Sequence, residues 1–486
     1  MIPGQRVFHP AFGTGRVISV SRTGPRTVAL VDFGFTRAPI VLEALQALST
    51  DEGTATDSQP TNSLDAVPAE APVKESPTAP VEVEHRERSH GSAGLGGSAT
   101  EARKGVTALR LGQVLETQVL ELSVGTDRVQ ARLGDALTRA LGDRPTFLLV
   151  DGVWGGGKTH ALTLLQALAR KENMATASAV MDGVAVTLSE PMQLMEEVVS
   201  SLRFPGSVSA DSLGQFLRKA KRETRSSTLR ARGADQVADA LDSLPLAAFD
   251  DPEGLQCIED YFSFSLSTTQ IRSKLRLLEY EASAPPVLRA RRVDDRPRAF
   301  AVLLKNWAQF SAVMGARGLL IVLDELDVEY ASTAYFSKAC FGLRARRRAL
   351  LKQLKALSEH RAPLLVALAS APAGPDVETE NDAVEDVREA MGPTLIHIKA
   401  ANPNDDELKD LLSRLTALYQ TAYPATTLEL PAQWASDLFG GLHARYRRMP
   451  NAVPRHFVRT ALEALDLLTV GEKSFDEVLQ LLRASD

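Results

Sequence analysis

Short runs of consecutive apolar residues alternate along most of the chain with longer stretches in which apolar residues recur every three or four positions. The clearest apolar runs are residues 146–150, 319–323 and 364–369. Such runs are typical of strands that are covered on both faces, and the longer stretches are typical of amphipathic helices. From about residue 102 onward, the pattern therefore predicts an α/β domain in which helices cover a parallel sheet.

Two segments of this region lack the alternation. Residues 206–305 form a long and mostly helical interruption, and after about residue 402 the pattern is helical throughout. We therefore expect one large domain over residues 102–401, with a helical insertion at about 206–305. A C-terminal helical domain that acts as a lid is expected over residues 402–486.

The first 49 residues follow a third pattern, in which short β-rich runs alternate with turn signals. The stretch GQRVFHPAFGTGRV, from Gly4 to Val17, resembles the SH3-like or Tudor-like modules at the ends of some DNA-repair helicases and of regulators that bind RNA polymerase. The resemblance implies a small β-barrel over residues 1–49. Its five arginines outnumber its two acidic residues, which suits a nucleic-acid or acidic protein surface.

A segment of different composition, residues 50–101, joins these parts. It has no Phe, Trp or Tyr and is rich in Pro, Ser, Thr, Ala, Gly and acidic residues, so burial cannot offset the entropy of ordering it. We expect a flexible, solvated linker. Residues 51–90 carry nine acids against three bases, a net charge of −6 that equals the net charge of the whole chain. The acidity therefore belongs to the linker and does not exclude nucleic-acid binding elsewhere.

Composition places the 486-residue chain among multidomain globular proteins, because 44% of its residues are hydrophobic and 24% are charged. Cys257 and Cys340 are the only cysteines, too few for a disulfide framework or a cysteine zinc site. The N-terminus lacks the pattern of a signal peptide, and no apolar run reaches 18 residues. We expect a cytoplasmic protein that does not associate with membranes.

The strongest motif lies between the apolar run at 146–151 and a helical stretch at 160–168. Residues 152–159, GVWGGGKT, fit the phosphate-loop pattern G-x-x-x-x-G-K-[ST] without a mismatch. In such a loop, backbone N–H groups surround the phosphates, Lys158 reaches the β and γ oxygens, and Thr159 is a ligand of Mg²⁺. The residues predicted to bind ATP and Mg²⁺ are Gly152, Val153, Trp154, Gly155, Gly156, Gly157, Lys158, Thr159 and His160.

A second motif supplies carboxylates for the same site. The apolar run 319–323 ends in Asp324 and Glu325. The first acid is predicted to hold Mg²⁺, and the second to activate the attacking water. Small GTPases lack the second acid, so the pair favours an ATPase that hydrolyses its nucleotide.

Two further residues are candidates for sensing the γ-phosphate. Ser370 ends the apolar strand at 364–369, where ATPases of the AAA+ type place a polar sensor; a strand-end serine that caps a turn is the alternative. Arg455 lies in a Pro-Arg-x-x-x-Arg sequence that looks like the second sensor motif of AAA+ proteins. The alternative is a pair of solvated arginines, Arg455 and Arg459, one turn apart on a surface helix.

Taken together, residues 303–307, 318–327 and 125–127 and the Pro454, Arg455 and Arg459 cluster resemble the ATP-binding proteins of bacteriophage exclusion (BREX) systems. The resemblance extends over about residues 106–470. It implies a P-loop NTPase of the AAA+/ASCE-like class and a role in phage defence. Thr126 departs from the arginine expected after the turn glycine, and the N-terminal module is not a feature of every member.

A basic stretch at 344–355 is a candidate contact for DNA. On a helix, Arg344, Arg348, Lys352 and Lys355 form one positive stripe. The stripe could be a solvated face, a contact for DNA phosphates, or the source of an arginine finger for a neighbouring subunit. A second basic cluster comprises Arg289, Arg291, Arg292, Arg296 and Arg298.

The leading hypothesis is an AAA+-like ATPase that switches or remodels a DNA-associated defence complex, with DNA and other defence proteins such as a helicase as partners. A homo-oligomer is expected, because AAA+ machines usually place an arginine of one subunit at the nucleotide of another. The alternative is a nucleotide-dependent scaffold that recruits a helicase or RNA polymerase through residues 1–49 and hydrolyses little ATP. A replication-type loader shares the same motifs.

Overall fold

The computed structural model of the chain forms two compact units, Met1–Ser89 and His90–Asp486, which are described separately. The structure describes side chains only from residue 98 onward. The described backbone comprises residues 6–9, 13–23, 26–32, 37–41, 46–47, 98–125, 127–153, 155–205, 213–288, 290, 292–334, 340–371, 382–400, 402–424, 433–448, 454–470 and 473–484. None of the helices in these ranges is both long and apolar enough to cross a membrane.

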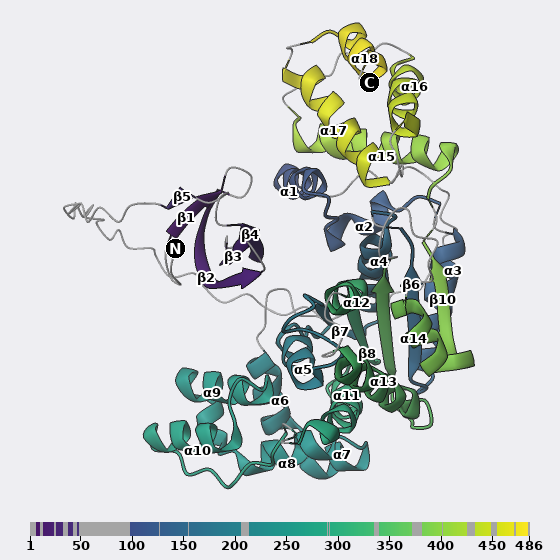
Figure 1. Cartoon of the computed structure of the whole chain (residues 1–486). Helices are drawn as coiled ribbons and strands as arrows, with labels where there is room; N and C mark the ends of the chain where they lie inside the picture. The colour runs from purple at the N-terminus through teal and green to yellow at the C-terminus, as the bar shows by residue number, and fades with distance from the viewer. Residues whose placement is uncertain are drawn as a thin grey trace, which may run out of the picture. The chain divides into compact units, whose positions relative to one another are not determined.

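The first unit contains an antiparallel sheet of five strands in the order β4-β3-β2-β1-β5 (Figure 1). The strands are β1 (Arg6–His9), β2 (Gly13–Thr23), β3 (Arg26–Asp32), β4 (Arg37–Val41) and β5 (Gln46–Ala47). An irregularity between Val17 and Ser19 shifts the register of β2 against β3, as a β-bulge does. The strands lie where the β-rich runs predicted them, whereas the SH3-like identity of the module stays a prediction.

The second unit is built on a parallel sheet of five strands in the order β10-β6-β9-β8-β7. The strands are β6 (Thr146–Asp151), β7 (Ala175–Val180), β8 (Leu319–Asp324), β9 (Leu364–Ser370) and β10 (Leu395–Lys399). Strand β9 lies between β6, which leads into the phosphate loop, and β8, which ends in the acidic pair. This order confirms the predicted α/β fold of a P-loop NTPase of the AAA+/ASCE-like class.

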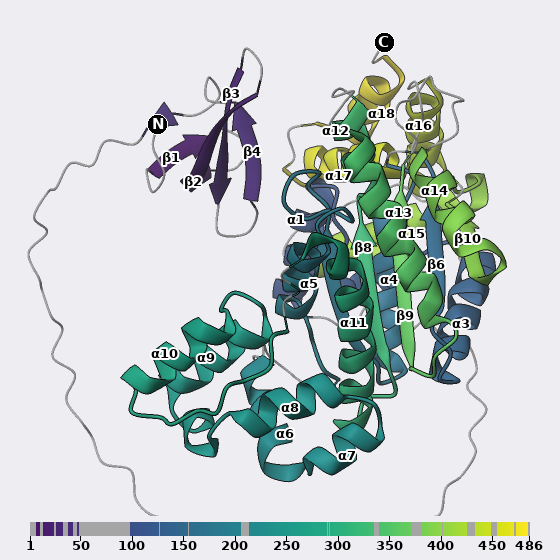
Figure 2. The ribbon, with the colours of Figure 1, turned by 60° about the horizontal axis from the view of Figure 1, so that its bottom comes forward.

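Helices cover both faces of this sheet (Figure 2). Side chains alternate along each strand, so that Leu148 and Val150 face one layer while Phe147 and Leu149 face the other. The first layer contains α2 (Glu116–Leu122), α3 (Asp127–Leu141) and α4 (Lys158–Lys171). The second contains α5 (Pro191–Ser200), α11 (Arg296–Val313), α13 (Cys340–Leu357) and α14 (Asp382–Met391). Double coverage explains why the strands read as unbroken apolar runs.

A group of helices between β7 and β8 extends from one end of the sheet (Figure 1). Its elements are α6 (Leu213–Glu223), α7 (Ser226–Ala231), α8 (Asp235–Ser243), η2 (Leu246–Phe249), α9 (Pro252–Phe262), α10 (Thr268–Leu277) and η3 (Val293–Asp295). Aromatic side chains of this group join it to α11, because Phe262 packs edge-on against Trp307, which packs against Phe310. These helices therefore share one core with the second layer of the sheet.

The C-terminal helices lie at the opposite end of the sheet, where β6 leads into the phosphate loop (Figure 1). They are α15 (Asp405–Ala422), α16 (Trp434–Arg448), α17 (Pro454–Val470) and α18 (Phe475–Ala484). Helix α1 (Ala99–Arg110) packs with them, since Val106 and Leu109 are buried in their core. This differs from the expected boundary at residue 102, which assigns α1 to the sheet domain. The apolar face of α1 packs against α15 and α17, which lie about 300 or more residues later in the sequence.

Candidate nucleotide-binding site

The phosphate loop joins β6 to α4 and depends on its glycines. Gly155 and Gly157 have φ angles of 78° and 93°, in the left-handed region that favours glycine. A Cβ atom at Gly156 would lie 2.9 Å from the carbonyl oxygen of Val153. Gly157 caps α4 without a side-chain hydrogen bond, so the first N–H groups of the helix have no side-chain cap and can bind phosphate. Trp154 lies outside the described residues.

Lys158, the first residue of α4, turns back over this loop. Its Nζ atom donates hydrogen bonds to the carbonyl oxygens of Gly152, at 2.9 Å, and Val153, at 3.0 Å. Burial lowers the pKa of Lys158, while the negative charges of Asp327 and Asp324 act in the opposite direction. The ammonium group is thus buried in the loop beside carboxylates, where a phosphate group would gain a strong interaction with it.

Thr159 and Asp324 form the pair predicted to hold Mg²⁺. Asp324 ends β8, and its carboxylate lies on the same face of the sheet as α4. Thr159 Oγ1 donates a hydrogen bond of 2.9 Å to Asp324 Oδ2. Mg²⁺ prefers oxygen ligands and is usually bound by one or two carboxylates together with substrate phosphates. One hydroxyl and one buried carboxylate beside a phosphate loop therefore fit this ion.

Glu325 leaves the line of β8 in a strained conformation. Its φ angle is 60°, which is uncommon for a residue other than glycine, and its N–H donates to Asp324 Oδ1 at 2.9 Å. Its side chain is exposed, whereas that of Asp324 is buried. Partial burial and the charges of Asp324 and Asp327 raise the pKa of Glu325 above its ordinary value, and the nearby Arg455 opposes this. A carboxylate with a raised pKa is better suited to accept a proton from water.

These residues line one hollow of about 1100 Å³ between the sheet and the C-terminal helices. Its polar wall contains Lys158, Thr159, Asp324, Glu325 and Arg455. Its apolar wall comes from the segment 109–129 and from the C-terminal helices, and consists of Leu109, Val114, Leu122, Val124, Val129, Leu411, Leu415 and Val458. A cavity with one charged wall and one apolar wall fits a molecule that has a phosphate chain and an aromatic base.

Arg455 reaches this hollow from the first turn of α17. Its Nη2 atom donates a hydrogen bond of 3.0 Å to the carbonyl oxygen of Gly112, and its charge acts on Glu325. The side chain of Arg459 is 69% exposed and pairs with Glu463 one turn along α17. The two arginines of the Pro-Arg-x-x-x-Arg sequence therefore differ, and Arg455 alone lines the hollow. Its role toward the γ-phosphate stays a prediction.

Ser370 is not brought to this hollow. Along β9, Val366 and Leu368 face the layer of α13, and alternation places Ser370 on that same side, opposite α4. Its side chain is fully buried, and the residue lies opposite Asp151 of the neighbouring strand β6. Ala371, the next residue, lines the hollow instead. The sensor role predicted for Ser370 lacks support from this placement.

Asp327 also lines the hollow, although neither of the two nucleotide-binding motifs includes it. Its Oδ1 atom accepts a hydrogen bond of 2.7 Å from the N–H of Ala371, which connects the start of α12 (Leu326–Ala334) to the end of β9. Of the charged groups around Lys158, Asp327 acts most strongly on its pKa. The available signal was a third acid two residues after the acidic pair, but only the fold shows which groups it contacts.

His160 links α4 to the segment that precedes α3. Its Nε2 atom lies 2.8 Å from Ser123 Oγ, and that hydroxyl donates its own proton to the carbonyl oxygen of Val119 at 2.5 Å. His160 Nε2 must therefore carry a proton and act as the donor. Burial lowers the pKa of His160 to about 4. The imidazole is neutral at pH 7, so it contributes a structural bond and no positive charge to the site.

Acid should destabilise the protein through His160. At pH values below its ordinary pKa of 6.5, the imidazole takes up a proton when the protein unfolds. The contribution of His160 to the free energy of unfolding is therefore complete above pH 6.5 and is lost as the pH falls toward 4. Between pH 7.5 and pH 4.5 we expect a loss of about 2 kcal/mol from this residue alone. Urea unfolding at both pH values measures it. His160→Gln should lose less stability over the same interval, and an equal loss would contradict the assignment.

The basic stripe on α13 is partly neutralised within the chain. Arg344 and Arg348 approach Asp386 of α14 at 3.5 Å and 3.0 Å, and Arg348 also pairs with Glu389 at 3.0 Å. These acids lie about 40 residues beyond the stripe, so local sequence could not reveal them. Lys352 and Lys355 are exposed, and no acid partner is seen for them among the described residues. A contact with DNA at this helix stays a prediction that rests on the two lysines.

The second basic cluster is only partly described. Arg289 and Arg291 lie outside the described residues. Arg296, at the start of α11, pairs with Glu190 at 2.8 Å, whereas Arg292 and Arg298 are exposed. Glu190 also accepts a hydrogen bond of 3.0 Å from Arg346 of α13. The described part of the cluster therefore includes one arginine that joins elements within the chain.

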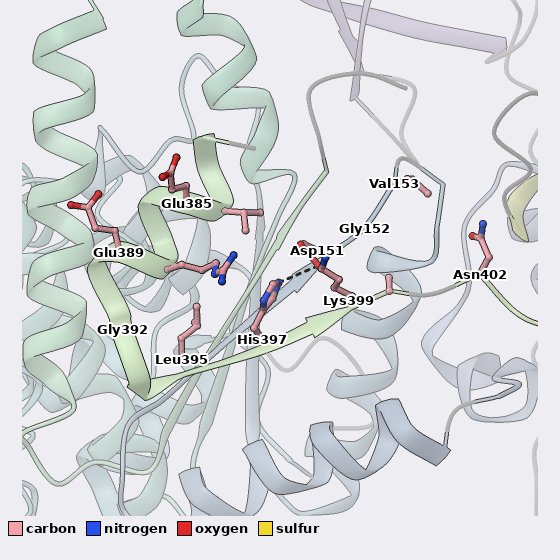
Figure 3. Close-up of a pocket in the computed structure, with 13 residues that line it drawn as sticks. Asp151, Gly152, Val153, Glu385, Glu389, Gly392, Leu395, His397, Lys399 and Asn402 are labelled. Atoms are coloured by element: carbon pink, nitrogen blue, oxygen red, sulfur yellow. Dashed lines mark ion pairs between the residues drawn. The ribbon is translucent and has the colours of Figure 1, made fainter. Parts of the chain in front are cut away.

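A second hollow of about 1020 Å³ flanks the phosphate loop between α14 and β10. Figure 3 shows Glu385 and Glu389 on α14, and Asp151 and His397 pointing toward each other from β6 and β10. His397 Nε2 lies 3.1 Å from Asp151 Oδ1. The walls carry both signs of charge and include Gly152 and Val153 of the phosphate loop, but they lack Lys158, Thr159 and Asp324. Because Lys158, Thr159 and Asp324 line the first hollow, the nucleotide is predicted to bind there.

Comparison with known families gives one match in sequence. Residues 98–246 match the family described as BREX system ATP-binding protein BrxC/D. The matched segment includes the phosphate loop, and it confirms the resemblance to the BREX ATP-binding proteins for this part of the chain. No curated protein matches the chain.

Two of the solved structures that are similar to the chain show a distant likeness. A chain in the structure of the E. coli MS115-1 HORMA:CdnC:Trip13 complex is 13% identical over 76% of this chain and 92% of its own length, with a TM-score of 0.39. A chain in the structure of Drosophila ORC bound to DNA is 10% identical over 83% of this chain and 70% of its own length, with a TM-score of 0.35. The fold class rests on the strand order and the phosphate loop, not on these two likenesses.

Proposed function

We propose that this chain, whose residues 98–246 match the BREX ATP-binding proteins, is a Mg²⁺-dependent ATPase that switches or remodels a DNA-associated complex in phage defence. One observation carries this proposal. Lys158, Thr159, Asp324, Glu325 and Arg455 come from three distant parts of the sequence and line one hollow.

The polar wall would bind the phosphate chain of ATP. The free N–H groups at the start of α4 and the positive end of its dipole favour the β-phosphate. Lys158 would exchange its bonds to the carbonyl oxygens of Gly152 and Val153 for bonds to the β and γ oxygens. Arg455 reaches the hollow from the opposite side and suits the γ-phosphate.

The acidic pair would divide metal binding and water activation. Thr159 and Asp324 would hold Mg²⁺, which supplies neutralisation of the charge on the β and γ oxygens when it is bound. Glu325 is exposed to the hollow and has a raised pKa, so it can orient a water molecule and accept its proton. The different surroundings of the two acids support their different roles.

The apolar wall would receive the base. Val124 and Leu122 precede α3, and Leu411 and Leu415 come from one face of α15. A purine between these aliphatic side chains would lose contact with water on both faces, which is favourable at about 25 cal/mol per Å² of apolar surface. Because one side of the wall belongs to α15, bound ATP would hold the C-terminal helices against the parallel sheet and its covering helices.

The defence role extends beyond the site itself. We propose that the protein works with DNA, with other defence proteins such as a helicase, and with further copies of itself. The module at residues 1–49 and the lysines at 352 and 355 are the candidate contact surfaces. A scaffold that binds ATP but hydrolyses little of it is the second candidate function, and the hydrogen bond between Thr159 and Asp324 fits that role equally well.

Phosphate release separates these two functions. The full chain should release phosphate from ATP in the presence of Mg²⁺, and chelation of the metal should stop the release. Duplex DNA is expected to change the rate if the protein acts on a DNA-associated complex. ATP binding without turnover, with and without DNA, would favour the scaffold over the ATPase.

A further inference from the structure

The carbonyl group of Gly112 accepts a hydrogen bond from Arg455. Gly112 lies two residues after the end of α1, and Arg455 Nη2 donates to its carbonyl oxygen at 3.0 Å. A guanidinium is planar and carries five N–H donors in a fixed geometry. A bond at one of these donors therefore restricts the plane in which the whole group lies, and with it the direction in which the group faces the hollow.

This contact requires a residue without a side chain at position 112. The φ angle of Gly112 is 74°, in the left-handed region. A Cβ atom there would lie 2.6 Å from Nε and 2.9 Å from Cζ of Arg455, closer than real Cβ contacts. Glycine thus allows both the turn that ends α1 and the close approach of the guanidinium.

Helix α1 holds this carbonyl group in a fixed place relative to α17. Arg110 Nη2 pairs with Asp466 Oδ1 of α17 at 2.5 Å, and Leu109 is buried in the core that α1 shares with the C-terminal helices. The N–H of Gly112 bonds to the carbonyl oxygen of Leu109 at 2.9 Å, so the turn itself is closed. Gly112 is therefore attached to the same helix that carries Arg455.

The direction of Arg455 matters for the chemistry because Arg455 lines the same hollow as Lys158 and Glu325. We propose that Gly112 is a positioning residue that holds Arg455 over the γ-phosphate end of the hollow. This inference rests on the proposed ATPase function. The end of α1 thereby becomes part of the nucleotide site, although no residue of α1 carries a nucleotide-binding motif.

The test compares substitutions at Gly112 with a matched glycine. Gly112→Ala adds the clashing Cβ atom and strains the backbone, whereas Gly112→Asn adds the same Cβ atom with less strain, because Asn tolerates left-handed φ. Gly315→Ala is the control, since Gly315 has a φ of 96° and open space around its Cβ position. Thermal unfolding of all three variants shows whether they fold. If Gly112→Ala does not fold, Gly112→Asn still tests the inference.

Steady-state ATPase kinetics and ADP binding give the result. Both Gly112 variants should lose about tenfold in kcat, as much as Arg455→Ala, with the affinity for ADP unchanged because ADP has no γ-phosphate. Gly315→Ala should keep the wild-type kcat. Adding Arg455→Ala to Gly112→Asn should cause no further loss, because both changes remove one interaction.

Three outcomes would overturn the inference while leaving the ATPase function intact. In the first, the Gly112 variants keep the wild-type kcat, as Gly315→Ala does. In the second, the double variant loses as much additional kcat as Arg455→Ala loses alone. In the third, Arg455→Ala keeps the wild-type kcat. A wild-type protein that releases no phosphate would instead contradict the proposed function itself.

Discussion

A Glu325→Gln variant is expected to bind ATP as tightly as the wild type and to hydrolyse it at least a hundredfold more slowly. The change removes the group that accepts a proton from water but leaves Lys158, Thr159 and Asp324 in place. A hundredfold loss corresponds to about 2.7 kcal/mol of transition-state stabilisation. Single-turnover hydrolysis and equilibrium binding of ATP measure the two quantities separately.

A nearby acid provides the control for this variant. Glu385 lines the second hollow, on the other side of the phosphate loop, and is exposed like Glu325. Glu385→Gln should keep the wild-type rate. The raised pKa of Glu325 adds a second expectation. As the pH is lowered, the wild-type rate should begin to fall at a pH above the range in which an ordinary glutamate takes up a proton. Equal activity of Glu325→Gln and the wild type would remove Glu325 from the mechanism.

A Lys158→Ala variant is expected to lose ATP binding by a hundredfold or more. Its ammonium group is buried in the phosphate loop and bonds to the carbonyl oxygens of that loop, so alanine removes the positive charge from this place. Charge-assisted hydrogen bonds to phosphate are worth about 1.5–3 kcal/mol each, and Lys158 would make two of them. Isothermal titration with ATP and Mg²⁺ measures the loss.

The same helix offers the matched control. Lys171 ends α4 on the exposed side, so Lys171→Ala removes the same group from the same element without touching the loop. Lys171→Ala should bind ATP normally. Comparable affinities of Lys158→Ala, Lys171→Ala and the wild type would mean that the phosphate loop is not the nucleotide site.

The strands and the phosphate loop could be predicted because their signals are local. Each buried strand is one continuous apolar run, and residues 152–159 match a contiguous pattern. The proximity of Thr159 and Asp324 could be predicted from the motifs as well, since the phosphate loop that leads to Thr159 follows the carboxyl end of β6, and Asp324 lies at the carboxyl end of β8 in the same parallel sheet.

Features that depend on distant contacts could not be predicted in this way. Gly112 meets Arg455 across 343 positions of sequence, and Asp386 neutralises two arginines of α13 from another helix. The placement of Ser370 depends on which side of β9 faces α4, and a strand covered on both faces gives no hydrophobic alternation from which to read it.

The most direct test of the site is a structure of the Glu325→Gln variant with ATP and Mg²⁺ bound. We expect the phosphates to lie at the start of α4, with the γ-phosphate between Lys158 and Arg455 and the metal at Thr159 and Asp324. The base should lie against Leu411 and Leu415. Nucleotide in the hollow lined by Asp151 and His397, or a γ-phosphate that Arg455 does not contact, would contradict it.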